Sequence, residues 1–137
     1  MTAIVTPMLA LVVWTLVMWL WMYIRRIPAL QAAGIAPDEA RHPGSLDLLP
    51  SDVRAAADNY NHLHEQPTLF YAIVVYSHLT GLDSALAVGL AWTYVALRIV
   101  HSLIQITINR VLLRFLVFAA ASVVLIVLTA LNVLALM

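Results

Sequence analysis

Hydrophobic residues fall into four long runs along this chain of 137 residues, and shorter polar stretches separate the runs. A helix needs about 20 mainly apolar residues to cross a hydrocarbon core of about 30 Å. The first run is long enough by itself, since it is broken only by two threonines. The pattern therefore predicts four membrane-spanning helices, at residues 3–24, 52–79, 83–108 and 110–136, with a connecting loop at 25–51.

The polar stretches carry residues that start and end helices. The loop at 25–51 contains four prolines and two glycines among mixed charges, which indicates an exposed connection. At the start of the second helix, Ser51 can cap the backbone and the Asp52 carboxylate complements the helix dipole. Gly81 is expected to end that helix. The first run does not read as a signal peptide, because no basic stretch precedes it and Arg25 and Arg26 follow it.

Composition agrees with this reading. Hydrophobic residues make up 64% of the chain and charged residues only 10%, which is typical of a polytopic membrane protein. We expect residues 1–137 to form one all-α membrane domain in contact with lipids. The formal net charge is zero, so nucleic acid is not expected as a partner. The chain has no cysteine, and any thiol chemistry must use a thiol that a ligand brings.

The arginines predict an orientation. All except Arg98, which lies inside a helix, gather in or beside the first and third loops, whereas the short second loop and both termini carry none. By the positive-inside rule, the first and third loops face the cytoplasm and both termini face away from it. The expected location is therefore the inner cell membrane.

Two opposite charges fall at similar depth inside the predicted spans. Glu65 lies 14 residues before Leu79, roughly 21 Å below the outer end of the second helix. Arg98 lies 15 residues after Asp83, roughly 22 Å below the outer end of the third helix. Because the two helices run antiparallel, the two side chains can pair.

Helical spacing gathers further polar residues around this pair. On the third helix, Tyr94, Arg98, His101 and Gln105 form one stripe. On the second helix, Asp58, His62 and Glu65 share a face, with Asn61 beside them. These stripes predict an internal polar layer.

Two features of this layer bear on its role. Pro67 cannot donate to the Leu63 carbonyl, so it is expected to free that acceptor and kink the second helix. Ionisable side chains within spans are rare and costly, which favours a functional role for the layer. A structural ion pair that fixes helix register is the alternative.

A metal site is weakly indicated. His62 and Glu65 have a spacing that can chelate, and His101 is a possible third ligand. His62 and His64 diverge on a helix, however, and paired carboxylate motifs are absent from the sequence. A metal-dependent or proton-handling membrane protein therefore stays as the third hypothesis, and no metal is expected in the leading one.

Two short motifs carry a family resemblance. The second helix bears Glu-Gln-Pro-Thr-Leu-Phe-Tyr at 65–71, and the third bears Arg-Ile-Val-His at 98–101. Their order and placement resemble the MAPEG family, the membrane-associated proteins in eicosanoid and glutathione metabolism, and its bacterial-type members in particular. The resemblance implies a four-helix transmembrane bundle that assembles as a homotrimer. It also implies glutathione sites between subunits near the cytoplasmic side.

Site residues follow from the same resemblance. Glu65 matches the glutamate that helps to hold glutathione, and Arg98 and His101 match the family's R-x-x-H pattern. Arg114 matches the arginine thought to stabilise the glutathione thiolate. A guanidinium near a sulfur favours the charged form and so lowers the pKa of the thiol.

The chain also departs from the family pattern. Asn61 and His62 stand where an Arg-Asn pair is common, Gln105 replaces a tyrosine that contacts glutathione, and Phe118 replaces a second tyrosine. Asn61, His62 and Gln105 are nevertheless placed with Glu65, Arg98 and His101 in the candidate thiol-binding set. An arginine at the end of the first helix, Arg25 or Arg26, is a candidate partner for a carboxylate.

The leading hypothesis is a glutathione-dependent transferase or peroxidase that acts on hydrophobic small molecules, with Arg114 as the catalytic residue. The alternative is a non-catalytic lipid-binding or scaffold member of the same family.

Overall fold

The computed structural model describes residues 3–137, which are mostly helical and contain no strand. Its elements are α1 (Val5–Ala32), η1 (Pro37–Ala40), η2 (Pro43–Leu46), α2 (Ser51–His62), α3 (Pro67–Leu79), α4 (Ala85–Ile106) and α5 (Val111–Leu134).

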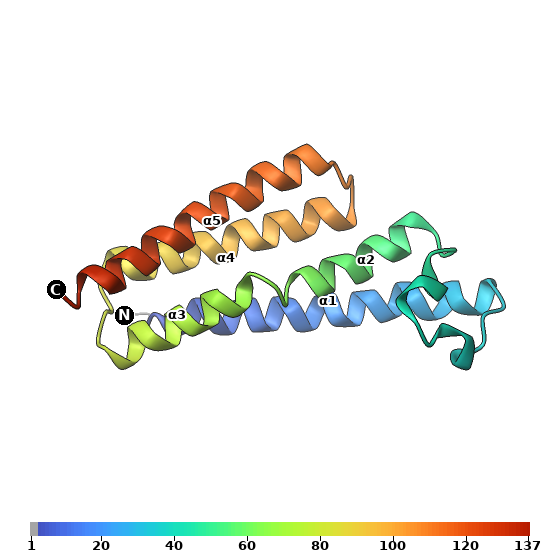
Figure 1. Cartoon of the computed structure of the whole chain (residues 1–137), viewed down its shortest axis with the longest axis horizontal. Helices are drawn as coiled ribbons and strands as arrows, with labels where there is room; N and C mark the ends of the chain where they lie inside the picture. The colour runs from blue at the N-terminus through green and yellow to red at the C-terminus, as the bar shows by residue number, and fades with distance from the viewer. Residues whose placement is uncertain (1–2) are drawn as a thin grey trace.

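The helices form a four-span transmembrane bundle, as the sequence predicts. Helices α2 and α3 follow one another along α1, and α4 and α5 form a hairpin beside them (Figure 1). Within residues 3–137, α1, α4 and α5 are each long and apolar enough to cross a membrane alone. Helices α2 and α3 make the fourth crossing together. The start of α1 and the C-terminus lie at the end of the bundle where α3 turns into α4 (Figure 1).

The predicted second helix, 52–79, is interrupted. Helix α2 ends at His62 and α3 begins at Pro67, with turns between them. Proline has no N–H to donate and disfavours helical geometry in the residue before it, whereas it is well tolerated in the first turn of a helix. Pro67 therefore starts a new helix where a kink within one helix was expected.

The first helix is longer than the predicted 3–24. It continues through Ala32, because the segment after Pro28 consists of strong helix formers. It stops at Gly34, whose φ of 67° is left-handed and suits glycine. The Ile35 N–H then donates to the Leu30 carbonyl at 3.1 Å and closes the last turn. The irregular connection is therefore shorter than residues 25–51.

Polar contacts hold α1 at both ends. Near the N-terminus, the Ile4 N–H donates to the Asp83 carboxylate at 3.1 Å. Near the other end, Arg25 forms an ion pair with Asp52 in the first turn of α2. These contacts tie α1 to the α3–α4 loop and to α2.

Small residues let α4 approach the centre of the bundle. Ala87 and Ala91 are completely buried in the same core cluster as Leu11 and Phe70. The Phe70 ring stacks on Tyr94 of α4, with centroids 4.5 Å apart. Tight packing of this kind leaves no room for larger side chains.

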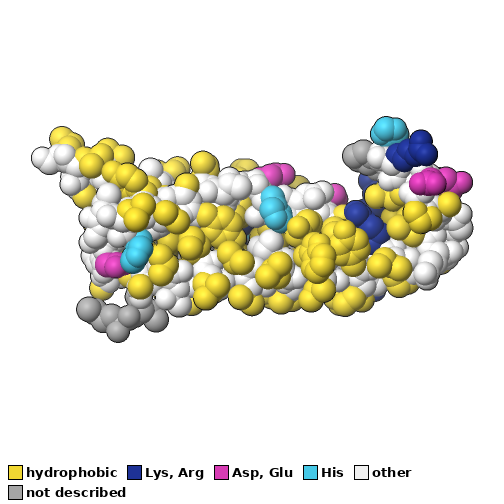
Figure 2. Space-filling view, turned by 90° about the horizontal axis from the view of Figure 1, so that it is seen from below, with side chains coloured by type: hydrophobic (Ala, Val, Ile, Leu, Met, Phe, Trp, Pro, Cys, Tyr) yellow, Lys and Arg dark blue, Asp and Glu magenta, His cyan; other side chains and the backbone are white. Residues whose placement is uncertain are grey.

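Large apolar side chains cover much of the outer surface. Figure 2 shows hydrophobic side chains along one face, with the arginines of that face gathered towards one end. Of the three helices that can cross a membrane alone, α5 has the smallest share of buried residues in its apolar part. Such a surface is suited to lipid contact.

We expect Ala91→Leu to destabilise the protein by about 1–3 kcal/mol, because extra methylene groups overpack a filled core. The matched control is Ala96→Leu, on the exposed side of the same helix. Thermal unfolding in detergent measures both variants. An unchanged melting temperature for Ala91→Leu would contradict the packing described here.

Candidate functional site

A polar cavity of about 590 Å³ opens between α2, α4 and α5. Its lining contains six of the seven residues that the sequence singles out, namely Asn61, His62, Glu65, His101, Gln105 and Arg114. Asp58, Val111, Phe115 and Phe118 complete the lining. The contributions of α2 and α5 each follow helical spacing, so each helix turns one face to the cavity.

The seventh residue, Arg98, lies behind this lining. Its side chain is completely buried, and Nη2 donates to the His62 carbonyl at 3.3 Å. Its guanidinium carbon is 5.9 Å from the centre of the Phe118 ring. Arg98 therefore supports the end of α2, where the His62 carbonyl also accepts the Glu65 N–H at 3.3 Å in the turn that follows the helix. The sequence predicted a freed acceptor at Leu63, one residue further along.

The predicted pairing of Glu65 with Arg98 is not formed. No ion pair joins them among residues 3–137; the Glu65 carboxylate instead contacts Nδ1 of His62 at 2.9 Å. The helix break places Glu65 in a turn, where its side chain is 66% exposed, while Arg98 stays buried beneath His62. Both residues still belong to the same region of the bundle.

Aromatic rings fix the positions of the two histidines. The His62 ring stacks on Phe118, with centroids 5.8 Å apart and planes 19° apart. His101 meets His62 edge-on, with ring centroids 4.9 Å apart. The sequence gives Phe118 only as a departure from the family pattern. Its spacing of four from Arg114 is the signal that places it on the same face of α5.

Several buried polar atoms of this region have no hydrogen-bond partner within residues 3–137. They include Nε and Nη1 of Arg98, Oε1 of Gln105 and Nε of Arg114. Buried polar groups are nearly always satisfied in proteins. Such a cluster is therefore suited to a polar ligand.

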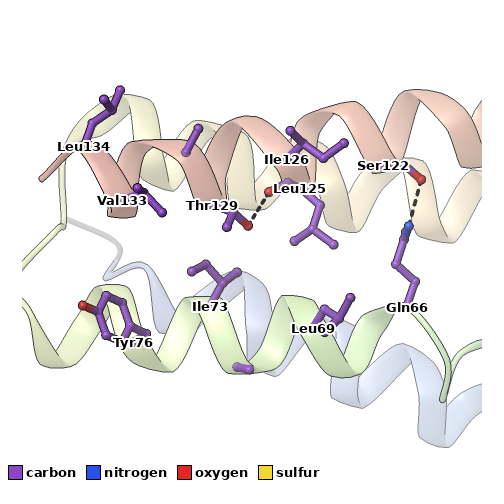
Figure 3. Close-up of a pocket in the computed structure, with 12 residues that line it drawn as sticks. Gln66, Leu69, Ile73, Tyr76, Ser122, Leu125, Ile126, Thr129, Val133 and Leu134 are labelled. Atoms are coloured by element: carbon purple, nitrogen blue, oxygen red, sulfur yellow. Dashed lines mark hydrogen bonds between the residues drawn. The ribbon is translucent and has the colours of Figure 1, made fainter. Parts of the chain in front are cut away.

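A second, apolar groove of about 960 Å³ runs between α3 and α5. Figure 3 shows its lining, including Leu69, Ile73, Ile126 and Val133. A hydrogen bond of 2.8 Å from Gln66 to Ser122 spans the two helices within this lining.

Gln66 also accepts a hydrogen bond of 3.1 Å from the Tyr94 hydroxyl of α4. Its neighbour Glu65 lines the polar cavity. The two compartments thus adjoin at consecutive residues of the chain.

A metal centre finds no support in this geometry. Residues 3–137 contain no group of three or more His, Asp or Glu side chains placed to hold a metal ion.

Comparison with known families identifies the class of protein. The model described as MAPEG family matches residues 4–134, and the chain therefore belongs to the MAPEG family. This is a family of membrane proteins related to glutathione transferases and peroxidases. Comparison with curated proteins finds no match, and comparison with solved structures finds none either.

We expect Arg98→Met to raise the melting temperature of the ligand-free protein. The substitution removes one of the two donors to the His62 carbonyl, at a cost of about 1–3 kcal/mol. Removing a buried cation that has no carboxylate partner relieves a penalty of several kcal/mol, which is larger. Thermal unfolding in detergent measures the difference, with exposed Arg54→Met as the control within about 0.5 kcal/mol of wild type. A lower melting temperature for Arg98→Met would show that the buried guanidinium stabilises the fold.

Proposed function

We propose that this chain is an integral membrane enzyme that joins glutathione, or a similar thiol, to lipophilic electrophiles or uses it to reduce lipid peroxides. The observation that carries the proposal is the polar cavity with its buried, unpartnered donors and acceptors, directly beside an apolar groove. One compartment suits a charged reactant and the other suits a hydrophobic one.

The lining of the cavity complements the groups of glutathione. Asp58 and Glu65 are anions for its ammonium group, and the buried Arg98 adds positive potential from behind the lining. The amide of Gln105 suits its peptide groups. A volume of about 590 Å³ lies within the usual range for small-molecule sites, roughly 300–1,000 Å³. The residues present therefore fit this co-substrate.

A further cation lies near the same cavity. Arg26 lines a second hollow of about 340 Å³, which shares Asp58 and Asn61 with the first. Arg25 is already engaged with Asp52, so Arg26 is the better candidate for a carboxylate at the far end of the ligand.

In the proposed reaction, Arg114 stabilises the thiolate. It lies at the start of α5, where its side chain borders the cavity and its Nε is buried without a partner among residues 3–137. A guanidinium beside the sulfur favours the ionised form, which is the nucleophile. Glu65, His101 and Gln105 hold the rest of the ligand, with Asn61 and His62 beside them and Arg98 supporting the lining from behind.

The hydrophobic reactant occupies the apolar groove and enters it sideways from the bilayer. We place the enzyme in the inner cell membrane as a homotrimer, with the first and third loops in the cytoplasm and both termini on the other side. The polar cavity then opens towards cytoplasmic glutathione, since it lies nearer the arginine-rich end.

The groove itself favours a second candidate function. The apolar groove of about 960 Å³ can accommodate an acyl chain without any thiol chemistry. A non-catalytic lipid-binding or scaffold protein is therefore the alternative.

Reduced glutathione should stabilise the detergent-purified protein against heat. A ligand that binds only the folded state stabilises it by about 2.7 kcal/mol at a hundredfold excess over Kd. Thermal unfolding across a glutathione titration measures the shift. A protein that binds lipid alone would gain no stability from glutathione, and that outcome would favour the alternative.

Arg114→Ala should lower kcat by about 10²–10³-fold, because it removes a preorganised charge from the reacting sulfur. The KM for glutathione should change far less. Steady-state conjugation of an aromatic electrophile measures both, and Arg110→Ala outside the cavity is the matched control. Equal losses in binding and in turnover would assign Arg114 to binding instead.

A further inference from the structure

His62 and Glu65 form a carboxylate–imidazole pair at the break between α2 and α3. The Glu65 carboxylate lies 2.9 Å from Nδ1 of His62, and both side chains line the polar cavity. Because an ionised carboxylate only accepts hydrogen bonds, Nδ1 is the protonated ring nitrogen in this pair. In the neutral form of such a ring, Nε2 is the nitrogen that can accept a proton.

The surroundings hold this ring in one orientation. Phe118 stacks on it, His101 meets it edge-on, and Arg98 anchors the backbone carbonyl of His62. The His62 side chain is 27% exposed, so it is partly buried and yet reachable from the cavity. A base that is oriented in advance by a carboxylate is the arrangement that general base catalysis requires.

His101 is less suited to this role, although it lies next to His62. Its side chain is only 3% exposed, and no carboxylate contacts its ring among residues 3–137. The geometry therefore distinguishes the two histidines.

We propose that His62, oriented by Glu65, is the catalytic base that takes the proton from the thiol bound in the cavity. The inference rests on the proposed function and adds a residue to it. The S–H bond breaks, its proton moves to Nε2 of His62, and its electron pair stays on sulfur.

The same proton completes the reaction with an α,β-unsaturated carbonyl compound. Sulfur forms a bond to the β-carbon, the C=C π bond breaks, and its electron pair moves to the α-carbon. His62 then returns its proton to the α-carbon. No other reactant is needed, and the base is regenerated.

The charges around the ring bear on the transfer. The positive charges of Arg98 on α4 and Arg114 on α5 disfavour a positive charge on His62. The negative charges of Asp58 and Glu65 favour it. His101 on α4 also faces the ring. After the transfer, the imidazolium is beside Glu65 and the thiolate is beside Arg114, so each new charge has an opposite partner. Glu65 is therefore a positioning residue that also balances charge.

The test is to measure the ionisation of bound glutathione directly. The ultraviolet absorbance of the thiolate, followed against pH, gives the fraction of bound thiol that is ionised. Stabilisation against heat measures glutathione binding in the same samples. The variants are His62→Gln, which retains a polar side chain but cannot take the proton, and Glu65→Gln. The control is His64→Gln, since His64 is exposed and does not line the cavity.

In His62→Gln, we expect the ionisation of bound glutathione to move to higher pH and turnover at neutral pH to fall at least 10²-fold. Stabilisation by glutathione should persist. Glu65→Gln should shift the ionisation in the same direction, and it keeps the inference testable if His62→Gln fails to fold. His64→Gln should resemble wild type.

The possible failures differ from one another. If glutathione does not stabilise the wild-type protein, the proposed function is wrong and this inference is wrong with it. If glutathione binds but His62→Gln ionises it and turns it over like wild type, only the role of His62 is wrong.

Discussion

The hydrogen bond from Arg98 to the His62 carbonyl is the contact on which the arrangement of the site depends. Inside a membrane, a backbone carbonyl released by a broken helix needs a partner from a neighbouring span. Arg98 is that partner for the His62 carbonyl, which also accepts the Glu65 N–H, and it ties α4 to the end of α2. The break in turn places Glu65 in a turn at the mouth of the cavity. The break between α2 and α3 and the buried Arg98 are thus linked through the His62 carbonyl.

Much of the fold follows from the sequence. Apolar runs locate the four spans, and the helix ends at Gly34 and Gly81 reflect glycine's access to left-handed geometry. The break at Leu63 does not follow from the sequence. Whether a proline kinks or breaks a helix depends on which neighbouring side chains can donate hydrogen bonds to the backbone carbonyls near it. That donor, Arg98, is 36 residues away in the chain.

Part of the candidate site could also be predicted from the sequence. Spacing on single helices puts Asp58, His62 and Glu65 on one face, and the structure lines one cavity with them. Spacing says nothing about which partner a side chain selects. Glu65 contacts His62, which is nearby, instead of Arg98, which stays buried behind the ring. The functional roles of these residues stay predictions.

The side chains of Glu65 and Gln66 border two different compartments, one polar and one apolar. Water-soluble and oil-soluble molecules react slowly when each is confined to its own phase. In the proposed reaction, a chain that turns from a polar to an apolar compartment within a single peptide unit would let each reactant keep its preferred solvent until the two meet. Chemists obtain the same advantage by adding a phase-transfer catalyst to a two-layer flask.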